Sequence, residues 1–452
     1  MKRMSLGALA AAGLMAGSFA TGASAADLGG NCCADLEERI AELEATTARK
    51  GNRKVSLTIS GFVAKQLIYW DDGFESNTYI TDTGSVSIGT HVAFTGQATI
   101  APGWTAGYVL KVEIIADDSL LVNQASDDPP GTNAQALVAN GVFSNFGIES
   151  SYWFIKSEKH GRLSVGLQSS AADNQAILPD GSGSLVQANY VLYDINGFSL
   201  RDSVGNLSAL GYGSLASCAP LNGGGGVAGD CDGYPKNVVR YDTPTFAGFS
   251  ASASWGEDDD WAVSGRYAGE FSGIKIAVAA AYNKSKDENG PGGIFANGVG
   301  VVGGHDASAF QVGGFIMHVQ TGLFLYGAYA EEYIDTAGLN KPEGDMWYVK
   351  AGIRQKWNPL GHTVLYGEYG EDSDKMDTGS FLTGTTASEL ERYGLGIVQE
   401  IDAATMSVWL SWRHYEGSVT CAAAGCFGGI GAVGNNSFEE FDLIKAGALI
   451  NF

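Results

Sequence analysis

The stretch that decides the fold is FEEFDLIKAGALINF, residues 438–452, in which apolar and polar side chains alternate. Successive side chains of an extended strand point to opposite faces. One face of this strand is therefore apolar, and it carries Ile444, Ala446, Ala448, Ile450 and Phe452. A final strand of this kind is typical of a transmembrane β-barrel and unusual in a soluble protein. We expect Phe452 to act as the assembly signal of such a barrel.

The other end of the chain predicts export. Lys2 and Arg3 form a basic start, residues 6–20 are a short apolar run, and Ala23-Ser24-Ala25 has the A-x-A pattern of a cleavage site. A buried N-terminal helix would not usually carry these three signals in this order. We expect residues 1–25 to be a signal peptide. Beyond them no run of eighteen apolar residues occurs, so only a closed barrel could span a membrane.

Composition agrees with an extracytoplasmic β-protein. Hydrophobic residues make up 45% of the 452 residues, with 64 Gly and only 10 Pro. The formal net charge is −23, and loss of Lys2 and Arg3 with the signal peptide makes it −23 − 2 = −25. Such an acidic chain is not a partner for nucleic acid.

Segments with alternating polarity recur along the whole chain, separated by turn residues. We predict an all-β fold, an antiparallel barrel of about sixteen strands over residues 55–452, with a water-filled interior. The predicted strands are 55–70, 86–100, 104–116, 151–158, 162–168, 237–243, 249–256, 261–271, 274–283, 309–320, 323–332, 346–357, 363–370, 391–401, 405–415 and 438–452. Short turns and longer polar loops alternate between them, which predicts a periplasmic and an outer rim.

Basic strand residues mostly share a face with polar neighbours. They are Lys111, Arg162, Arg266, Lys350, Arg354, Arg392, Arg413 and Lys445. A basic residue on the lipid side at mid-membrane would cost about 2 to 4 kcal/mol, so we assign them to the lumen, although single ones could lie at a rim in headgroup water. Lys65 shares the apolar face of its strand and implies a bulge or a position near a rim.

The six cysteines form three local pairs. In an oxidising compartment, Cys218 with Cys231 and Cys421 with Cys426 are expected to form disulfides within loops. The adjacent Cys32 and Cys33 could bridge subunits, pair with each other or stay reduced. None of the pairs has the spacing of a zinc site, so no metal site is expected.

Residues 26–54 precede the first strand. Leu36, Ile40 and Leu43 have the spacing of a coiled-coil seam, over only about two heptads. A short periplasmic three-helix stalk, a lone amphipathic helix and a frayed linker are all compatible with this segment.

Enzyme motifs are weak or missing. Residues 298–303 spell G-x-G-x-x-G, but in a Gly-rich loop with no helix after it. Residues 257–260, EDDD, could collect Ca²⁺ or bridge to lipopolysaccharide phosphates, and a solvated acidic loop is the simpler interpretation. We expect no catalytic site and no cofactor.

Two blocks carry a family resemblance: CCADLEERIAELEATTARKGNRKVSLTISG (residues 32–61) and VVRYDTPTFAGFSASASWGEDD (residues 238–259). With the terminal aromatic strand, they resemble the general-diffusion porins of α-proteobacteria. The resemblance implies a homotrimer of sixteen-stranded barrels in the outer membrane that passes small hydrophilic solutes and ions passively. It also implies that the third outer loop, here residues 171–236, folds into each barrel and narrows it.

Within this resemblance, Arg240 corresponds to a wall residue that faces the constriction. Candidate acidic residues of the third loop are Asp173, Asp180, Asp194 and Asp202. The candidate basic wall opposite them consists of Arg162, Arg240, Arg266, Lys350, Arg354 and Arg413. Opposed charges across a narrow pore would orient dipolar solutes.

The expected function is therefore that of an outer-membrane porin, with a substrate-selective outer-membrane channel as the alternative. A selective channel would need an aromatic or basic track in the pore and saturable uptake. Expected partners are outer-membrane lipid, lipopolysaccharide, and the barrel-assembly machinery through the C-terminal strand.

Overall fold

The computed structural model describes residues 55–84, 89–114, 119–125, 146–216, 218, 231–233, 235–256, 259–287, 305–335, 343–375, 384–426 and 429–452. The expected signal peptide, the Cys32/Cys33 pair, the seam of Leu36, Ile40 and Leu43, and the glycine-rich 298–303 motif lie outside these residues.

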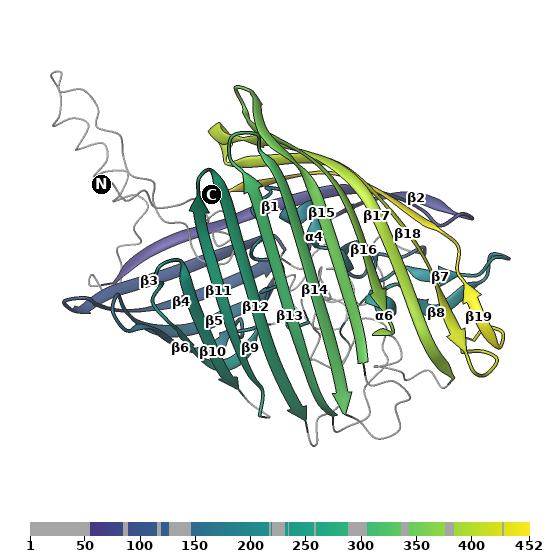
Figure 1. Cartoon of the computed structure of the whole chain (residues 1–452), viewed down its shortest axis with the longest axis horizontal. Helices are drawn as coiled ribbons and strands as arrows, with labels where there is room; N and C mark the ends of the chain where they lie inside the picture. The colour runs from purple at the N-terminus through teal and green to yellow at the C-terminus, as the bar shows by residue number, and fades with distance from the viewer. Residues whose placement is uncertain are drawn as a thin grey trace.

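Sixteen antiparallel strands form one closed barrel, as predicted (Figure 1). They are β1 (Ser56–Asp71), β3 (His91–Ala101), β4 (Trp104–Ile114), β5 (Phe146–Ser157), β6 (Gly161–Gln168), β9 (Lys236–Asp242), β10 (Phe249–Gly256), β11 (Trp261–Phe271), β12 (Ile274–Asp287), β13 (His305–His318), β14 (Leu323–Asp335), β15 (Glu343–Asn358), β16 (Gly361–Ser373), β17 (Thr385–Ile401), β18 (Met406–Cys421) and β20 (Phe441–Asn451). Each strand pairs with the next in this series.

The C-terminal strand closes the barrel. β20 pairs with β18 on one side and with β1 on the other, in a register that runs from Phe62 opposite Asn451 to Asp71 opposite Asp442. The last residue takes part, because Phe452 and Gly61 exchange two backbone hydrogen bonds of 3.1 Å. The alternating pattern of residues 438–452 therefore corresponds to a strand with partners on both edges.

Two short strands were not predicted. β2 (Ser76–Thr81) pairs with the outer end of β1, and β19 (Gly434–Ser437) pairs with the outer end of β18. Both extend hairpins beyond the barrel wall. A separate two-stranded sheet, β7 (Ser199–Arg201) with β8 (Leu207–Gly211), lies in the third loop.

The wall is interrupted beside the middle of β1. β2 pairs with the outer half of β1 and β3 with its inner half, and the described residues between them, 82–84 and 89–90, belong to no strand. The second strand therefore begins at His91 and not at residue 86. Across the gap, the Thr90 hydroxyl accepts a hydrogen bond from the Ala64 amide and donates one to the Ala64 carbonyl, both at 3.1 Å.

Lys65 projects from β1 at this interruption. Its Nζ lies 3.5 Å from Oδ2 of Asp82, whose side chain is buried. β1 has no register shift against β20, β2 or β3. The partner of the outward-pointing Lys65 is therefore Asp82, which lies at the gap between β2 and β3, and β1 itself has no bulge.

Side chains sort by face along the strands. Large apolar residues such as Leu325 and Leu395 are exposed on the outer face, whereas Lys350, Arg392 and Lys445 are buried on the inner face. The outer face also exposes Trp104, Trp153, Trp255, Trp261 and Trp357, as an interfacial aromatic belt requires. Among the described residues, no helix is long and apolar enough to cross a membrane.

The third loop, residues 169–235 between β6 and β9, folds into the barrel. It carries the short helices α4 (Leu185–Asn189), α5 (Leu192–Ile195) and α6 (Gly213–Ala216), of which α4 and α6 are labelled in Figure 1. Aromatic residues join it to the wall, with ring centroids 5.5 Å apart for Trp70 and Phe198 and 5.2 Å apart for Tyr212 and Phe441. An apolar core thus lies inside the barrel and holds the loop in place.

Candidate functional site: the lumen and its charged residues

The start of the third loop runs along the inner face of the barrel wall. The Ala171 amide donates to Ser254 Oγ on β10 (2.9 Å), and the Ala176 amide donates to Gln311 Oε1 on β13 (2.9 Å). Tyr326 on β14 donates its hydroxyl proton to the Ala176 carbonyl at 2.8 Å. The backbone approaches so closely that a Cβ on Gly313 would lie 1.7 Å from the Ala176 oxygen, so only glycine fits there.

Farther along, buried ion pairs fasten the loop to the opposite wall. Lys350 Nζ on β15 lies 2.6 Å from Asp180 Oδ2, with both side chains fully buried, and also donates to Asn189 Oδ1 at 3.0 Å. Asp194 receives both Arg413 Nη1 of β18 and Lys445 Nζ of β20, each at 2.6 Å. These contacts tie helices α4 and α5 to three wall strands.

One wall carboxylate completes this buried cluster. Glu368 on β16 accepts hydrogen bonds from Arg413 Nε (2.8 Å) and Nη2 (3.1 Å), and from the Tyr348 hydroxyl. The three cations of the cluster are matched by three carboxylates, from Asp180, Asp194 and Glu368. Charges this deeply buried are tolerated only when paired in this way. We call these six side chains the anchor cluster; its members are Lys350, Arg413, Lys445, Asp180, Asp194 and Glu368.

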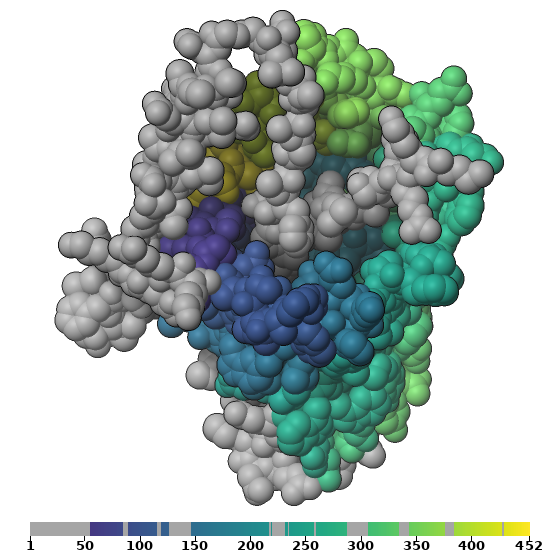
Figure 2. All heavy atoms as spheres, turned by 90° about the vertical axis from the view of Figure 1, so that its left-hand side faces the viewer, coloured from purple at the N-terminus to yellow at the C-terminus, as the bar shows by residue number. Residues whose placement is uncertain are grey.

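A second group of charges stays partly open to solvent. Arg162 on β6, Arg240 on the adjacent β9 and Arg266 on β11, which is separated from β9 by β10, project inward and are half-buried. Figure 2 shows one end of the barrel. The surface there is hollowed between two groups of strands: the blue strands, which include β3 and β4, and the strands coloured teal to green. We call the three residues the arginine cluster.

The contacts of the arginine cluster leave much of its charge uncompensated. Arg240 binds Asp242 through Nε (3.0 Å) and Nη2 (2.8 Å), and its Nη1 donates to the Ser170 carbonyl at 2.8 Å. Arg162 donates to the Tyr152 hydroxyl, and Arg266 donates to Gln175. Among the described residues, neither Arg162 nor Arg266 forms a salt bridge with a carboxylate.

Asp202 and Arg354 lie apart from both clusters, whereas Asp173 lies close enough to Arg266 to interact with it electrostatically. Asp173 is buried and accepts a hydrogen bond from Asn174 Nδ2. Asp202 lies in the turn between β7 and β8. Slight burial raises the pKa of its carboxyl group, but hydrogen bonds from the side chain and backbone of Asn206 lower this pKa and have the larger total effect. Arg354 near the short-turn end of β15 pairs with Glu400 at 2.7 Å. The structure therefore divides the ten predicted charged residues among several places.

Several residues of these clusters were not among the sequence candidates. Glu368 and Tyr348 occupy inward positions of β16 and β15, and Gln175 lies in the third loop. The alternation of polarity places Glu368 on the lumen face, which is the only signal that sequence offers for it. Asp242 stands in the block that resembles porins, directly after Arg240 and Tyr241.

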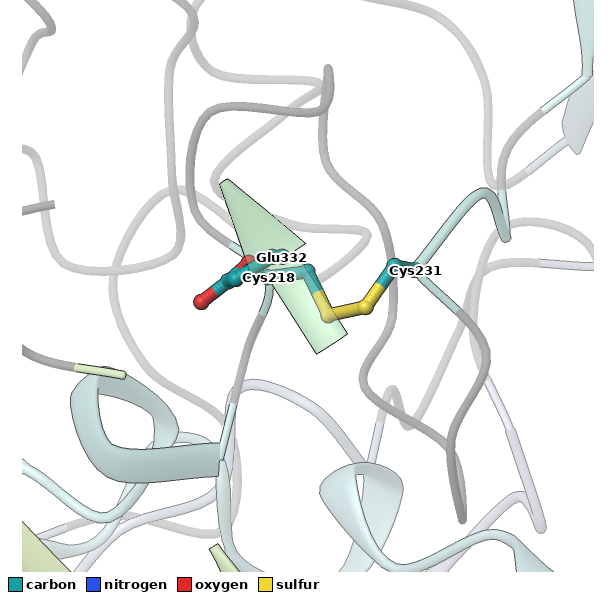
Figure 3. Close-up of side chains that lie close together, drawn as sticks. All are labelled: Cys218, Cys231 and Glu332. Atoms are coloured by element: carbon teal, nitrogen blue, oxygen red, sulfur yellow. A yellow bond between two sulfur atoms is a disulfide. The ribbon is translucent and has the colours of Figure 1, made fainter. Parts of the chain in front are cut away.

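Both predicted loop disulfides are present. Cys218 is bonded to Cys231, with Cα atoms 5.2 Å apart, and Cys421 is bonded to Cys426, with Cα atoms 5.6 Å apart. Figure 3 shows the first of these beside Glu332 of β14. Lys375 Nζ, just beyond the end of β16, lies 3.2 Å from Cys218 Sγ, so this contact links the disulfide of the third loop to the outer part of the wall.

Known structures share this fold. An anion-selective porin from Comamonas acidovorans superposes with a TM-score of 0.52 at 16% identity, covering 88% of this chain and 100% of that chain. The OmpF complex with daunomycin from Salmonella typhi gives a TM-score of 0.49 at 13% identity, covering 89% of this chain and 99% of that one. A comparison with curated protein sequences gives no match.

A family model settles the assignment. The model of the Gram-negative porins matches residues 8–408, which is 401 of the 452 residues. The closed sixteen-stranded barrel with buried charged residues on its inner face agrees with this match. The chain belongs to the Gram-negative porin family, and it is a passive diffusion channel of the outer membrane and not an enzyme.

Proposed function

We propose that this porin is a general-diffusion channel of the α-proteobacterial type and that it prefers anions. The single observation that carries the ion preference is the arginine cluster on the solvent-accessible part of the lumen. The blocks at residues 32–61 and 238–259 support the narrower family assignment.

Two of the acidic candidates in the third loop are paired with cations of the wall and do not act on the accessible part of the lumen. Asp180 and Asp194, the acidic candidates that contact the wall, are neutralised in the anchor cluster and fully or almost fully buried. Among the described residues of this group, three guanidinium ions face two carboxylates, those of Asp242 and Asp173, which gives 3 − 2 = +1. Basic side chains lining a pore attract anions and repel cations.

The candidate constriction residues divide into two functions in this proposal. Arg162, Arg240, Arg266 and Asp173 lie where the loop crosses the wall and act on passing ions. Asp180, Asp194, Lys350 and Arg413 set the position of the loop, while Asp202 and Arg354 contribute at the two ends of the channel.

Bilayer recordings test this function. Conductance should rise in proportion to salt concentration, and the zero-current potential across a KCl gradient should have the sign of chloride preference. Conductance that saturates at low solute concentration would instead support the substrate-selective channel. A potential of the opposite sign would contradict the proposed role of the arginine cluster.

The proposal also covers processing and assembly. Residues 1–25 are removed on export, residues 26–54 form a periplasmic segment, and residues 55–452 form the barrel. The mature chains form a homotrimer in contact with outer-membrane lipid and lipopolysaccharide. The pairing of Phe452 with Gly61 supports a role for the C-terminal strand in recognition by the barrel-assembly machinery. Conductance steps in groups of three would support the trimer.

A further inference from the structure

Three clusters of described residues combine His or Cys with carboxylates at short range. In the first, Cys218 and Cys231 are locked in a disulfide beside Glu332. In the second, His362 lies near two carboxylates, those of Glu400 and Asp402. Those carboxylates are already paired, with Arg354 at 2.7 Å and Lys356 at 2.8 Å. The third cluster lies on the outer face of β18 and β20 and has no Lys or Arg partner in the part of the chain that the structure describes.

The third cluster consists of His414, Glu416 and Glu440. His414 and Glu416 lie two residues apart on β18 and so share its outward face, and Glu440 directly precedes β20. One ring nitrogen or carboxylate oxygen from each residue lies within 4.8 Å of the others. The site is outside the conduction pathway and does not depend on the proposed ion preference.

The imidazole of His414 is positioned as in a metal ligand. Its side chain is 7% exposed, and Nδ1 lies 3.0 Å from Asp442 Oδ1. That contact favours a proton on Nδ1 and directs the lone pair of Nε2 toward Glu440 and Glu416. Nε2 lies 3.8 Å from Glu440 Oε2, too far for a hydrogen bond. Metal-binding histidines generally donate their second ring N–H to such a carboxylate.

The neighbourhood is negatively charged without compensation. Glu391 on β17 stands opposite Glu416, and Asp442 stands opposite His414. Among the described residues, none of the carboxylates of Glu391, Glu416, Glu440 and Asp442 forms a salt bridge with Lys or Arg. Like charges on paired strands are destabilising. A divalent cation would reverse this repulsion.

We propose that His414, Glu416 and Glu440 bind a divalent metal ion of the class that prefers imidazole, such as Zn²⁺, at the outer end of the seam between β18 and β20. Imidazole favours Zn²⁺ and its neighbours, whereas Ca²⁺ and Mg²⁺ prefer sites made entirely of oxygen. Three protein ligands leave a fourth tetrahedral position for water or a phosphate oxygen.

The geometry needs only a small adjustment to bind the ion. Tetrahedral Zn²⁺ places its ligand atoms about 3.3 Å apart, given metal–ligand distances of about 2.0 to 2.2 Å. The present separations of up to 4.8 Å must therefore shorten by roughly 1.5 Å at most. Glu440 can supply this movement, because its side chain is 69% exposed. Asp442 is in turn held by Trp412, whose Nε1 donates to it at 2.8 Å.

Co²⁺ is the probe of choice, since tetrahedral Co²⁺ has an intense visible absorption that octahedral Co²⁺ lacks. The full-length folded protein in detergent should develop this absorption at one equivalent of Co²⁺ and lose it when Zn²⁺ is added. His414→Gln should abolish it. Asp442→Asn, which removes the orienting carboxylate, should weaken binding by about 10- to 100-fold.

Control variants distinguish a specific metal site from nonspecific binding of the ion to acidic surface residues. Glu389→Gln alters the all-carboxylate cluster of Glu371, Glu389 and Glu391 and should leave Co²⁺ binding unchanged. If His414→Gln fails to fold, the variant Glu440→Gln at an exposed position provides the test, and its affinity for Co²⁺ should fall at least tenfold. Three results would overturn the proposal. The wild type could show no tetrahedral absorption, a folded His414→Gln or Glu440→Gln variant could show the same absorption as the wild type, or an equal concentration of Ca²⁺ could displace the Co²⁺.

Discussion

Lys350 Nζ on strand β15 lies 2.6 Å from Oδ2 of Asp180 in the third loop, and neither side chain is exposed to solvent. The two residues are 170 positions apart in sequence. This pair, together with the rest of the anchor cluster, converts a long loop into a fixed part of the channel interior. In the function that we propose, the loop narrows the lumen, and the anchor cluster keeps it from moving at random into the channel.

Breaking that pair should destabilise the loop. Lys350→Met leaves Asp180 buried without its ion partner, and such losses cost about 3 to 5 kcal/mol. The double variant Lys350→Met/Asp180→Asn should recover most of this free energy, because no unpaired charge remains. Thermal unfolding of both variants in detergent measures the difference. Additive losses in the double variant would show that the pair is not coupled.

Gly313 should be intolerant of any side chain. Gly313→Ala places a Cβ against the Ala176 carbonyl, so the start of the third loop must move and single-channel conductance should change. Gly314→Ala is the matched control, because a Cβ there meets nothing within 4 Å. Equal conductance of the two variants would contradict the close approach of loop and wall.

The two disulfides should differ in their effect on conduction. Replacing Cys218 and Cys231 together by Ser removes a cross-link of the third loop worth roughly 3 kcal/mol, so we expect noisier current and easier proteolysis of the loop. Replacing Cys421 and Cys426 by Ser alters the end of β18 and the loop after it, away from the third loop, and should leave the current unchanged. Proteolysis and bilayer recordings check both variants. The same noise in both would rule out a specific role for the first disulfide.

Thr90 should contribute to barrel stability through its hydroxyl. Thr90→Val leaves the Ala64 amide and carbonyl without their partner across the wall interruption, at a cost of about 1 to 3 kcal/mol. Thr90→Ser retains the hydroxyl and should stay near the wild-type stability. Denaturant unfolding compares the two variants, and equal destabilisation would mean that packing, not hydrogen bonding, matters at this position.

Much of the fold could be predicted from the sequence, because each side chain of a barrel strand faces either lipid or the lumen and has the polarity that this surrounding requires. Leu325 and Leu395 face outward because lipid requires it, and that requirement appears as a two-residue period. The same period placed Lys350 and Arg413 in the lumen. It also indicated sixteen strands without any knowledge of their partners.

The partners themselves could not be predicted, because they join distant segments. Asp194 and Lys445 are 251 positions apart, and nothing in their local patterns shows that they meet. The cluster of His414 and Glu440 likewise depends on how β18 and β20 pair. β2 and the interruption after it could not be predicted either, because the contacts of Asp82 with Lys65 and of Thr90 with Ala64 depend on how the strands pair.

The zero-current potential across a KCl gradient, measured for the wild type and for Arg162→Gln/Arg240→Gln/Arg266→Gln, tests the central claim most directly. A unit charge about 4 Å from a passing ion contributes about 1 kcal/mol in water, so removal of the arginine cluster should lower the chloride-to-potassium permeability ratio at least several-fold. Lys284→Gln on the outer face is the control and should keep the wild-type ratio. We predict chloride preference in the wild type that the triple variant loses; cation preference in the wild type, or an unchanged ratio in the triple variant, would contradict the account.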